Sequence, residues 1–593
     1  METEASASAH ETLGAIRSFS GRTWRWRVKD DRKAAALARD AGLSLSLAQL
    51  LSARGIAEND VADYLRPTLK RWLPEPLLLK DMERAIARTK SALEKGEKIA
   101  VFGDYDVDGS AAVAMIAGFF GDIGIPVRTY IPDRLREGYG PSVAAFARLR
   151  AEGATLVLTV DCGASAHEAV TAAQLAGLDV IVLDHHAVDT ASPAFAHVNP
   201  NQPGDCAGCG YLCATGVAFL FLVGLSRDLR NSGYYDRRGV REPDLRRMLD
   251  LVALATICDV VPLVGVNRAF VQLGLPRIGD RAGLAALARI AKAAPPFTPQ
   301  HLAFDFGPRI NAGGRIGKCS LGSELLLVSE EASASELATV LDLHNRERRS
   351  LERRILQEAV AAVVPQSNSA FVLVSEDGWH SGIVGIVAGR LRERFGKPSF
   401  VIGFEGGQGR GSARSIPGVD VGAVVRRARE LNLVDGGGGH AMAAGFSLSS
   451  AQLENFEAFL ARELVEISAE IEASRILDIE AALSPASATP LMADELAHAG
   501  PFGAGNPEPN LAVLDAQLVH AETVADDHVR VRVRGGDGAR LDAIAFRSAQ
   551  SPLGKGLLDG RGGRIHLAGR LRADEWNGTR RVQLLIEDAA ACA

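Results

Sequence analysis

The segment KIAVFGDYDVDG, residues 98–109, joins an apolar run to three closely spaced carboxylates. The apolar run from Ile99 to Phe102 has the composition of a buried strand. Aspartate is a poor strand former, and like charges repel at this spacing. Asp104, Asp106 and Asp108 nevertheless follow the run at every second position. Because alternate positions of an extended chain face the same side, we expect these carboxylates to face a common ligand.

Strand and helix patterns alternate on both sides of this segment. We expect strands over 98–102, 127–131, 155–160 and 179–183, and helices over 110–121, 142–152 and 166–175. A repeated β–α–β order predicts an α/β fold with a doubly wound parallel sheet covered by helices.

The chain has 593 residues, which is too long for one hydrophobic core. Helical spacing from 43 to 64 predicts a helical N-terminal region, and a long charged helix is expected over 333–364. That charge run is typical of a solvated helix face, with phosphate binding as the alternative. Five short β-prone runs after residue 477 predict an OB-like β-barrel. The predicted parts are a helical region (1–75), a catalytic α/β domain (76–290), a connecting helical region (291–364), a second α/β domain (365–465) and a barrel domain (466–593).

Composition indicates a globular protein, with 47% hydrophobic and 23% charged residues. A net charge of −6 argues weakly against a nucleic-acid-binding protein, so any basic surface must be local. No apolar stretch is long enough to span a membrane, and the N-terminus is polar, so we expect a soluble, cytoplasmic protein. The 7 cysteines are scattered, as expected in a reducing compartment. Cys206, Cys209 and Cys213 could suggest zinc, but we favour a turn with small apolar thiols.

Carboxylates or imidazoles also follow the other predicted strands. Asp161 follows the strand at 155–160, Asp184-His185-His186 follows 179–183, and Asp259 follows the apolar run from 249 to 257. Each alone has a simpler explanation, since an aspartate after a strand often caps a helix and a lone histidine is usually a core residue. Gathered at one sheet edge, however, they form a costly cluster of negative charge unless divalent cations bind there.

Oxygen ligands with one or two histidines suit Mg²⁺ or Mn²⁺. Two such ions a few ångströms apart hydrolyse phosphate esters. We therefore expect two ions, with Asp161, central in the sheet, bridging them.

Several residues could hold substrate phosphates. The run Gly436–Gly439 with His440 predicts a phosphate-binding loop rather than a flexible turn, and the following AMAAG predicts the start of a packed helix. Arginine binds phosphate in a bidentate manner, although a lone arginine is usually surface. Tyr139 could stack on a base or pack in the core. The candidate substrate-binding residues are Arg134, Tyr139, Arg309, Arg315, Ser381, Arg414, Gly438, Gly439 and His440.

The motifs together resemble the DHH phosphoesterase superfamily and, within it, the RecJ family of single-stranded-DNA exonucleases. The resemblance is carried by blocks in the order of that family and covers nearly the whole chain from about residue 75. These blocks are GDYDVDG (103–109), VDCG (160–163), LDHH (183–186), ATICDVVPL (255–263), RINAGGRIG (309–317), WHSGIVGIVAGRL (379–391), GGGGHAMAAGF (436–446) and PFGAGNPEP (501–509).

The resemblance implies a 5′→3′ exonuclease that releases 5′-mononucleotides from single-stranded DNA with Mg²⁺ or Mn²⁺. It also implies that the three globular parts are DHH, DHHA1 and OB domains. The metal ligands that it implies are Asp106, Asp108, Asp161, His185 and Asp259. Asp104 and His186 are either ligands themselves or neighbours that orient the ligands. The candidate protein partners are a single-strand-binding protein and a repair helicase, and we expect a monomer.

Two other functions remain as alternatives. The first is a DHH-family phosphodiesterase acting on short or cyclic oligonucleotides, which the barrel argues against because such enzymes are typically shorter. The second is a scaffold that has lost its metal, which the complete set of Asp and His positions argues against.

Overall fold

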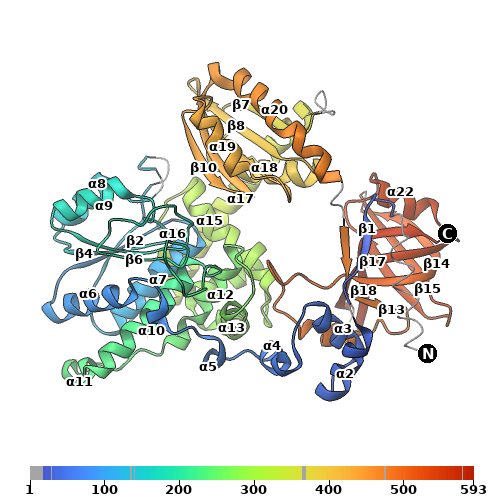
Figure 1. The fold of residues 1–593 in the computed structure, drawn as a ribbon, viewed down its shortest axis with the longest axis horizontal. Helices are drawn as coiled ribbons and strands as arrows, with labels where there is room; N and C mark the ends of the chain where they lie inside the picture. Colours follow the sequence, from blue (N-terminus) through green and yellow to red (C-terminus); the bar gives the residue numbers. More distant parts are fainter. Residues whose placement is uncertain are drawn as a thin grey trace. The chain divides into compact units, whose positions relative to one another are not determined.

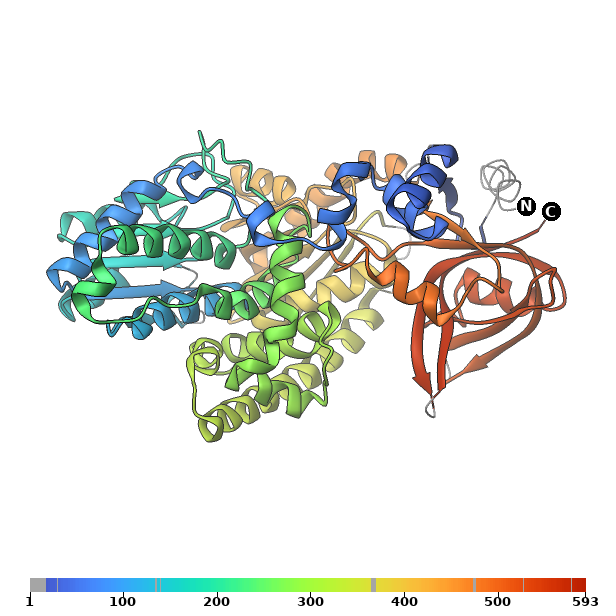
Figure 2. The same ribbon diagram turned by 90° about the horizontal axis from the view of Figure 1, so that it is seen from below.

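The computed structural model describes residues 18–28, 30–133, 136–138, 140–363, 369–472, 476–525, 527–576 and 579–592. They form two compact units, traced in Figures 1 and 2. The first unit comprises Pro74–Asp259 and Leu273–Ser474, and the second comprises Met1–Leu73, Val260–Gln272 and Arg475–Ala593. Within the described residues, no helix is long and apolar enough to cross a membrane.

The first unit begins with a five-stranded parallel sheet of order β3-β2-β4-β5-β6. Its strands are β2 (Ile99–Gly103), β3 (Arg128–Tyr130), β4 (Leu156–Val160), β5 (Asp179–Leu183) and β6 (Ala196–Val198). Helices α8 (Val143–Ala151) and α9 (His167–Leu175) pack on one face around Phe102 and Phe146. Helices α6 (Met82–Lys95), α7 (Val107–Asp122) and α10 (Ala214–Asn231) lie on the other face (Figure 1). The predicted doubly wound sheet is confirmed.

The aspartate segment after β2 is not extended. The strand ends at Gly103, Asp106 caps helix α7 by accepting a hydrogen bond from the Gly109 amide, and Asp108 lies in the first helical turn. The prediction that the three carboxylates alternate along an extended chain is therefore wrong. Gly109 is needed at this junction, because a Cβ there would lie 2.5 Å from the Asp104 carbonyl oxygen.

A helical region follows the parallel sheet. The long helix predicted over 333–364 is confirmed as α17 (Glu331–Val363). The apolar run before Asp259 is helix α12 (Leu249–Cys258), so Asp259 reaches the sheet edge from a helix. The other helices are α11 (Tyr234–Arg238), η3 (Leu245–Met248), η4 (Leu275–Asp280), α14 (Ala282–Ala291), the π-helix η5 (His301–Phe306), α15 (Gly307–Ile316) and α16 (Leu321–Leu327). Helix α13 (Val266–Gly274) lies mostly in the segment Val260–Gln272, which belongs to the second unit.

A second sheet completes this unit, with order β10-β11-β9-β8-β7. Only β7 and β8 are parallel. The elements are β7 (Val372–Asp377), α18 (Ser381–Phe395), β8 (Ser399–Glu405), β9 (Gln408–Arg414), α19 (Val421–Glu430), β10 (Gly436–His440), β11 (Ala443–Ser449), η7 (Ser450–Gln452) and α20 (Leu453–Glu472).

Two predictions about the glycine run are wrong. The run is strand β10 rather than a loop, and the residues from Ala443 continue as strand β11 rather than as a helix. Backbone pairing with β11 replaces the expected helical packing, because glycine and alanine fit where two strands and a helix approach closely.

The second unit contains the predicted barrel. Strands β14 to β18 close through the β14–β17 pairing, and β13 adds a sixth strand beside β14. The elements are β12 (Ile476–Ile479), β13 (Ala481–Leu483), α21 (Pro490–Ala497), β14 (Leu511–Val524), β15 (His528–Arg534), β16 (Arg540–Ala545), α22 (Pro552–Asp559), β17 (Arg564–Trp576) and β18 (Thr579–Ala591).

The N-terminal region belongs to the same unit as the barrel. Strand β1 (Thr23–Trp26), which was not predicted, pairs in parallel with β12. Leu50 and Leu51 of α3 pack into the barrel core. The helical stretch predicted over 43–64 is interrupted after α3, and Gly55 there has a φ of 72°. The elements here are α2 (Asp31–Ala41), α3 (Leu45–Ala53), η1 (Glu58–Asp60), α4 (Val61–Leu65) and α5 (Leu69–Trp72), and η2 (Pro76–Leu78) begins the first unit.

Candidate metal centre and substrate groove

Acidic and imidazole side chains gather at the carboxyl end of the parallel sheet, as expected for a ligand site in an open α/β fold. They come from the β2–α7 junction, from the ends of β4 and β5, and from the end of α12. Their ligand atoms form three groups, in each of which all atoms lie within 4.8 Å of one another. The groups are Asp104–Asp106–Asp161, Asp161–His185–His186 and Asp108–His185–Asp259.

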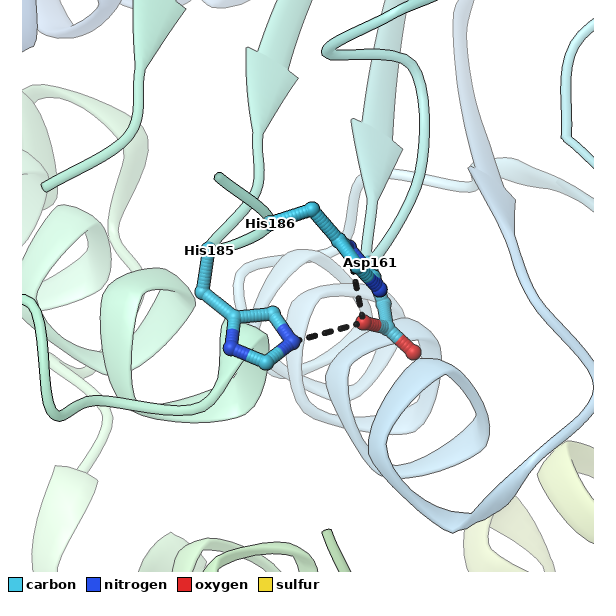
Figure 3. Close-up of side chains that lie close together, drawn as sticks. All are labelled: Asp161, His185 and His186. Atoms are coloured by element: carbon cyan, nitrogen blue, oxygen red, sulfur yellow. Dashed lines mark ion pairs between the residues drawn. The ribbon is translucent and has the colours of Figure 1, made fainter. Parts of the chain in front are cut away.

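Asp161 belongs to two of these groups and is buried. Figure 3 shows its Oδ1 facing both histidines, with His185 Nε2 at 3.4 Å and His186 Nδ1 at 4.0 Å. The backbone of Asp161 is left-handed, with a φ of 58°, and its amide donates to the Leu183 carbonyl of the next strand. Only a few residue types tolerate this backbone, and aspartate and asparagine are among them.

Asp108 serves the fold as well as the site. Its two oxygens accept hydrogen bonds from the Ala214 and Thr215 amides at the start of α10, at 2.7 and 2.8 Å. Its Oδ2 also lies 3.9 Å from His185 Nε2. Asp108 therefore both caps α10 and faces the cluster.

Asp259 shows that the donor set fits a cation. Its Oδ2 is buried and has no hydrogen-bond partner within the described residues, and it lies 3.6 Å from His185 Nε2. A buried oxygen without a donor is costly, and a divalent cation would satisfy it. Carboxylate oxygens with imidazole nitrogen are a donor set that Mg²⁺ and Mn²⁺ accept.

Charge repulsion is strong in the absence of cations. Burial and the neighbouring Asp106, Asp108, Asp259 and Asp104 raise the pKa of Asp161 well above its ordinary value. Burial, with Asp108 and Asp106, raises the pKa of Asp259 to about 9. Bound cations would reverse both shifts, because they favour the ionised carboxylates.

Asp184 holds the two histidines and was not among the predicted metal ligands. Its Oδ1 accepts hydrogen bonds from the His185 amide, the His186 amide and His186 Nδ1, the last at 2.7 Å. Burial lowers the pKa of His186, but the hydrogen bond and charge of Asp184 outweigh it and raise that pKa to about 9. The order Asp-His-His was visible in the sequence. The hydrogen bonds by which Asp184 orients the two histidines became visible only in the structure.

A cavity of about 740 Å³ opens beside the cluster, between the β2–α7 junction and α15 on one side and α18 with the second sheet on the other. Three predicted substrate-binding residues line it: Arg315, Ser381 and Arg414. Arg315 Nη1 donates to the Gly382 carbonyl at 2.9 Å, and Arg414 Nη1 donates to Ser412 Oγ at 2.9 Å. Burial and the nearby Arg315 and Arg392 lower the pKa of Arg414, so this end of the cavity favours an anion.

The other predicted substrate-binding residues lie differently. His440 stacks on His186, with ring centroids 6.1 Å apart, and Gly438 and Gly439 precede it on β10. Arg309 is not in the cavity lining, since its guanidinium is mostly buried against Asp342 at 2.9 Å. We therefore correct its expected role from phosphate binding to holding α17. Arg134 and Tyr139 lie outside the described residues.

Sequence reasoning missed several lining residues, among them Tyr105, Asn311, Arg410 and Ser412. Asn311 Oδ1 accepts a hydrogen bond from the Val107 amide at 3.0 Å, which ties α15 to the start of α7. Tyr105 packs against Gly314, where a Cβ would lie 1.8 Å from the ring. The motif RINAGGRIG thus contains one residue that holds the aspartate segment and one glycine that accommodates a ring beside it.

Comparisons with known proteins match this architecture. Residues 98–256 match the DHH family, N-terminal domain, residues 367–466 match the DHHA1 domain, and residues 479–588 match the RecJ OB domain. The single-stranded-DNA-specific exonuclease RecJ of Dickeya dadantii is 36% identical, and the alignment covers 87% of this chain and 92% of the relative. The RecJ of Escherichia coli is 34% identical over 91% of this chain and 95% of the relative. The chain belongs to the RecJ family.

Solved RecJ structures have the same fold. RecJ from Thermus thermophilus in complex with Mn²⁺ superposes with a TM-score of 0.78 at 28% identity, covering 96% of this chain and 80% of that one. The Mg²⁺ complex of the same RecJ gives a TM-score of 0.74 at 27% identity, with coverage of 96% and 79%. Both structures of this relative contain a divalent ion of the kind predicted from the donor set of this chain.

Proposed function

We propose that this chain is a metal-dependent, single-stranded-DNA-specific exonuclease that hydrolyses phosphodiester bonds in the 5′→3′ direction and releases 5′-mononucleotides. The observation that carries the proposal is the cluster of carboxylates and histidines opening into a cavity lined by arginines. Its membership of the RecJ family supports the substrate class. The alternative of a phosphodiesterase for short or cyclic oligonucleotides is not favoured, because the chain also carries the RecJ OB domain.

Seven residues would hold two Mg²⁺ or Mn²⁺ ions. One position would be held by Asp104, Asp106 and Asp161, and the other by Asp108, His185 and Asp259, with His186 beside Asp161. Asp161 is our candidate for the bridging ligand because it belongs to two groups. Asp184 would orient His186 through Nδ1, leaving Nε2 of that ring for a ligand or substrate oxygen.

When bound, such a pair of ions lowers the pKa of water and stabilises charge on a phosphoryl group. The protein's own residues would position the strand. Arg315 and Arg414 would hold phosphates in the cavity, with Ser381 and the Gly438–Gly439 backbone beside them. His440, stacked on His186, would donate to a phosphate oxygen close to the cluster.

The order of the domains along the chain suggests a function for each of them. We propose the five-part division 1–75, 76–290, 291–364, 365–465 and 466–593 as the functional domains. The barrel would bind single-stranded DNA, as OB folds do. We further propose a monomeric, cytoplasmic enzyme that works in DNA repair and recombination with a single-strand-binding protein and a repair helicase.

End-labelled oligonucleotides test this function. Wild-type protein with Mn²⁺ should release labelled mononucleotide at once from a 5′-labelled single strand and only late from a 3′-labelled one. Duplex DNA of the same sequence should be resistant, and EDTA should stop the reaction. Faster cleavage of a dinucleotide than of a long single strand would instead support the alternative function.

A further inference from the structure

One face of the second sheet forms a side of the cavity. The strand register places nine residues in three rows across this face: Arg410–Ser447–Gly436, Ser412–Gly445–Gly438 and Arg414–Ala443–His440. Alternate residues of a strand share a face, so these nine positions face the same side. The intervening Ala413, Ala444 and Phe446 are buried on the opposite face.

In the middle row, Gly445 and Gly438 leave the surface without side chains, and close packing does not require glycine at either position. A Cβ at Gly438 or at Gly445 would meet nothing within 4 Å, and neither residue has a positive φ. Their neighbours on β10 differ, because a Cβ at Gly437 or Gly439 would lie 2.8 or 2.4 Å from a carbonyl oxygen of β11. The fold therefore requires glycine at 437 and 439 but not at 438 and 445.

Arg410 stands in the row next to Gly445 and Gly438, opposite Ser447. Arg410 lines the cavity, is exposed, and has no hydrogen-bond or ion-pair partner in the part of the chain that the structure describes. Arg414 lies four residues further along the same strand, which is roughly 13 Å at the usual rise of a strand. The cavity thus has two arginine side chains on one strand, and beside them lies a surface formed by backbone without side chains.

We propose that Arg410 is a further phosphate-binding residue, and that the nucleic-acid strand crosses this face so that a sugar–phosphate unit lies over Gly438 and Gly445. An unpaired guanidinium in a groove is suited to binding a phosphate. Backbone without side chains lets the sugar–phosphate backbone of the nucleic acid approach closely. The inference rests on the proposed function and adds the path of the strand through the cavity.

The charge of Arg410 is tested with a short 5′-phosphorylated oligothymidylate, using full-length protein and Mn²⁺. Arg410→Ala should raise KM about tenfold and leave the melting temperature unchanged. The slope of log(kcat/KM) against log[salt] should become shallower by about 0.7, as expected for one lost phosphate contact on a single strand. Arg410→Lys should restore the salt slope, since it keeps the charge. Arg241→Ala, which removes another exposed arginine of this unit, is the matched control.

The open surface is tested by adding bulk. Gly445→Val and Gly438→Val should fold and bind Mn²⁺ as the wild type does, while KM rises about tenfold or more. Gly389→Val is the control, because a Cβ at 389 also meets nothing within 4 Å and Gly389 does not line the cavity.

The outcomes separate this inference from the proposed function. If the wild type and both controls fail to degrade single strands, the proposed function fails. If they degrade single strands and the Arg410 and Gly445 variants match them in KM and salt slope, the inference about the strand's path is overturned and the proposed function stands.

Discussion

At the scale of single residues, Asp161 combines backbone and charge requirements. Its left-handed φ of 58° makes alanine a poor test, because alanine would add backbone strain to the loss of charge. Asparagine tolerates this backbone and removes only the charge. The site can therefore be probed at its centre without disturbing β4.

We predict that Asp161→Asn abolishes exonuclease activity, with a fall of at least about 10³-fold, as expected when paired ions lose a shared ligand. The metal-free variant should melt at a higher temperature than the metal-free wild type, because one of several mutually repelling carboxylates is gone. Mn²⁺ should then stabilise the variant less than the wild type. Activity assays and thermal melts with Mn²⁺ or EDTA measure both effects, and retained activity would rule out the bridging role.

The raised pKa values of Asp161 and Asp259 predict a pH dependence. Because each pKa is higher in the folded protein than in the unfolded chain, the stabilisation from these groups is complete below about pH 4 and is lost as the pH rises through the folded pKa of each carboxyl, which for Asp259 is about 9. Cation binding requires the ionised carboxylates, so it strengthens over the same range. The rise in melting temperature on adding Mn²⁺ should thus be larger at about pH 8.5 than at about pH 6.5. Equal rises in melting temperature at the two pH values would contradict the raised pKa values of Asp161 and Asp259.

At the scale of elements, strand β10 shows two kinds of glycine. Gly439 has a φ of 150°, and a Cβ there would lie 2.4 Å from the Ala443 carbonyl oxygen, whereas Gly438 has open space. Arg426 Nη1 also donates to the Gly439 carbonyl, which joins α19 to the strand. The run GGGGH is therefore a strand in which alternate glycines have different reasons to be present.

We predict that Gly439→Ala lowers the free energy of unfolding by about 1–3 kcal/mol, the usual cost of such a backbone in a residue with a side chain. Gly438→Ala should change it by less than about 0.5 kcal/mol, as for a substitution that meets no neighbour. Denaturant unfolding of the two variants, differing by one position, measures the contrast. Equal destabilisation would mean that the register of β10 differs from the one described.

At the scale of the whole molecule, the N-terminal helices and the barrel share one hydrophobic core although they are far apart in sequence. Leu50 of α3 is fully buried in that core together with Leu511, Val531 and Leu567 of the barrel. Trp24 Nε1 adds a hydrogen bond to Asp588 at 3.0 Å. The second unit is thus built from both ends of the chain.

We predict that Leu50→Ala destabilises this unit by about 2–5 kcal/mol, as large-to-small core substitutions do. Hydrogen exchange of the full-length variant should speed up across the barrel strands and leave β2, β4 and β5 protected. Leu175→Ala, at a side chain that is 86% exposed, is the control. Faster exchange confined to α3 would contradict a shared core.

Most elements of the parallel sheet and the barrel, and the metal-binding side chains, could be predicted from the sequence alone. Strand and helix periods placed the parallel sheet and the barrel, because local propensity and patterning act over a few residues. The carboxylates and histidines were recognisable because strand ends in such a fold meet at one edge. Asp106 and Asp108 were among them, although they lie at a helix start and not on an extended chain.

Tertiary structure alone decided which partners each residue has. Arg309 and Arg414 are both arginines in recognisable motifs, yet one is paired with Asp342 and the other lines the cavity. Glycines 436–439 form a strand because β11 and α19 pack beside them, and Asp184 faces the histidines because of three hydrogen bonds. These outcomes depend on contacts between segments distant in sequence, which no local pattern encodes.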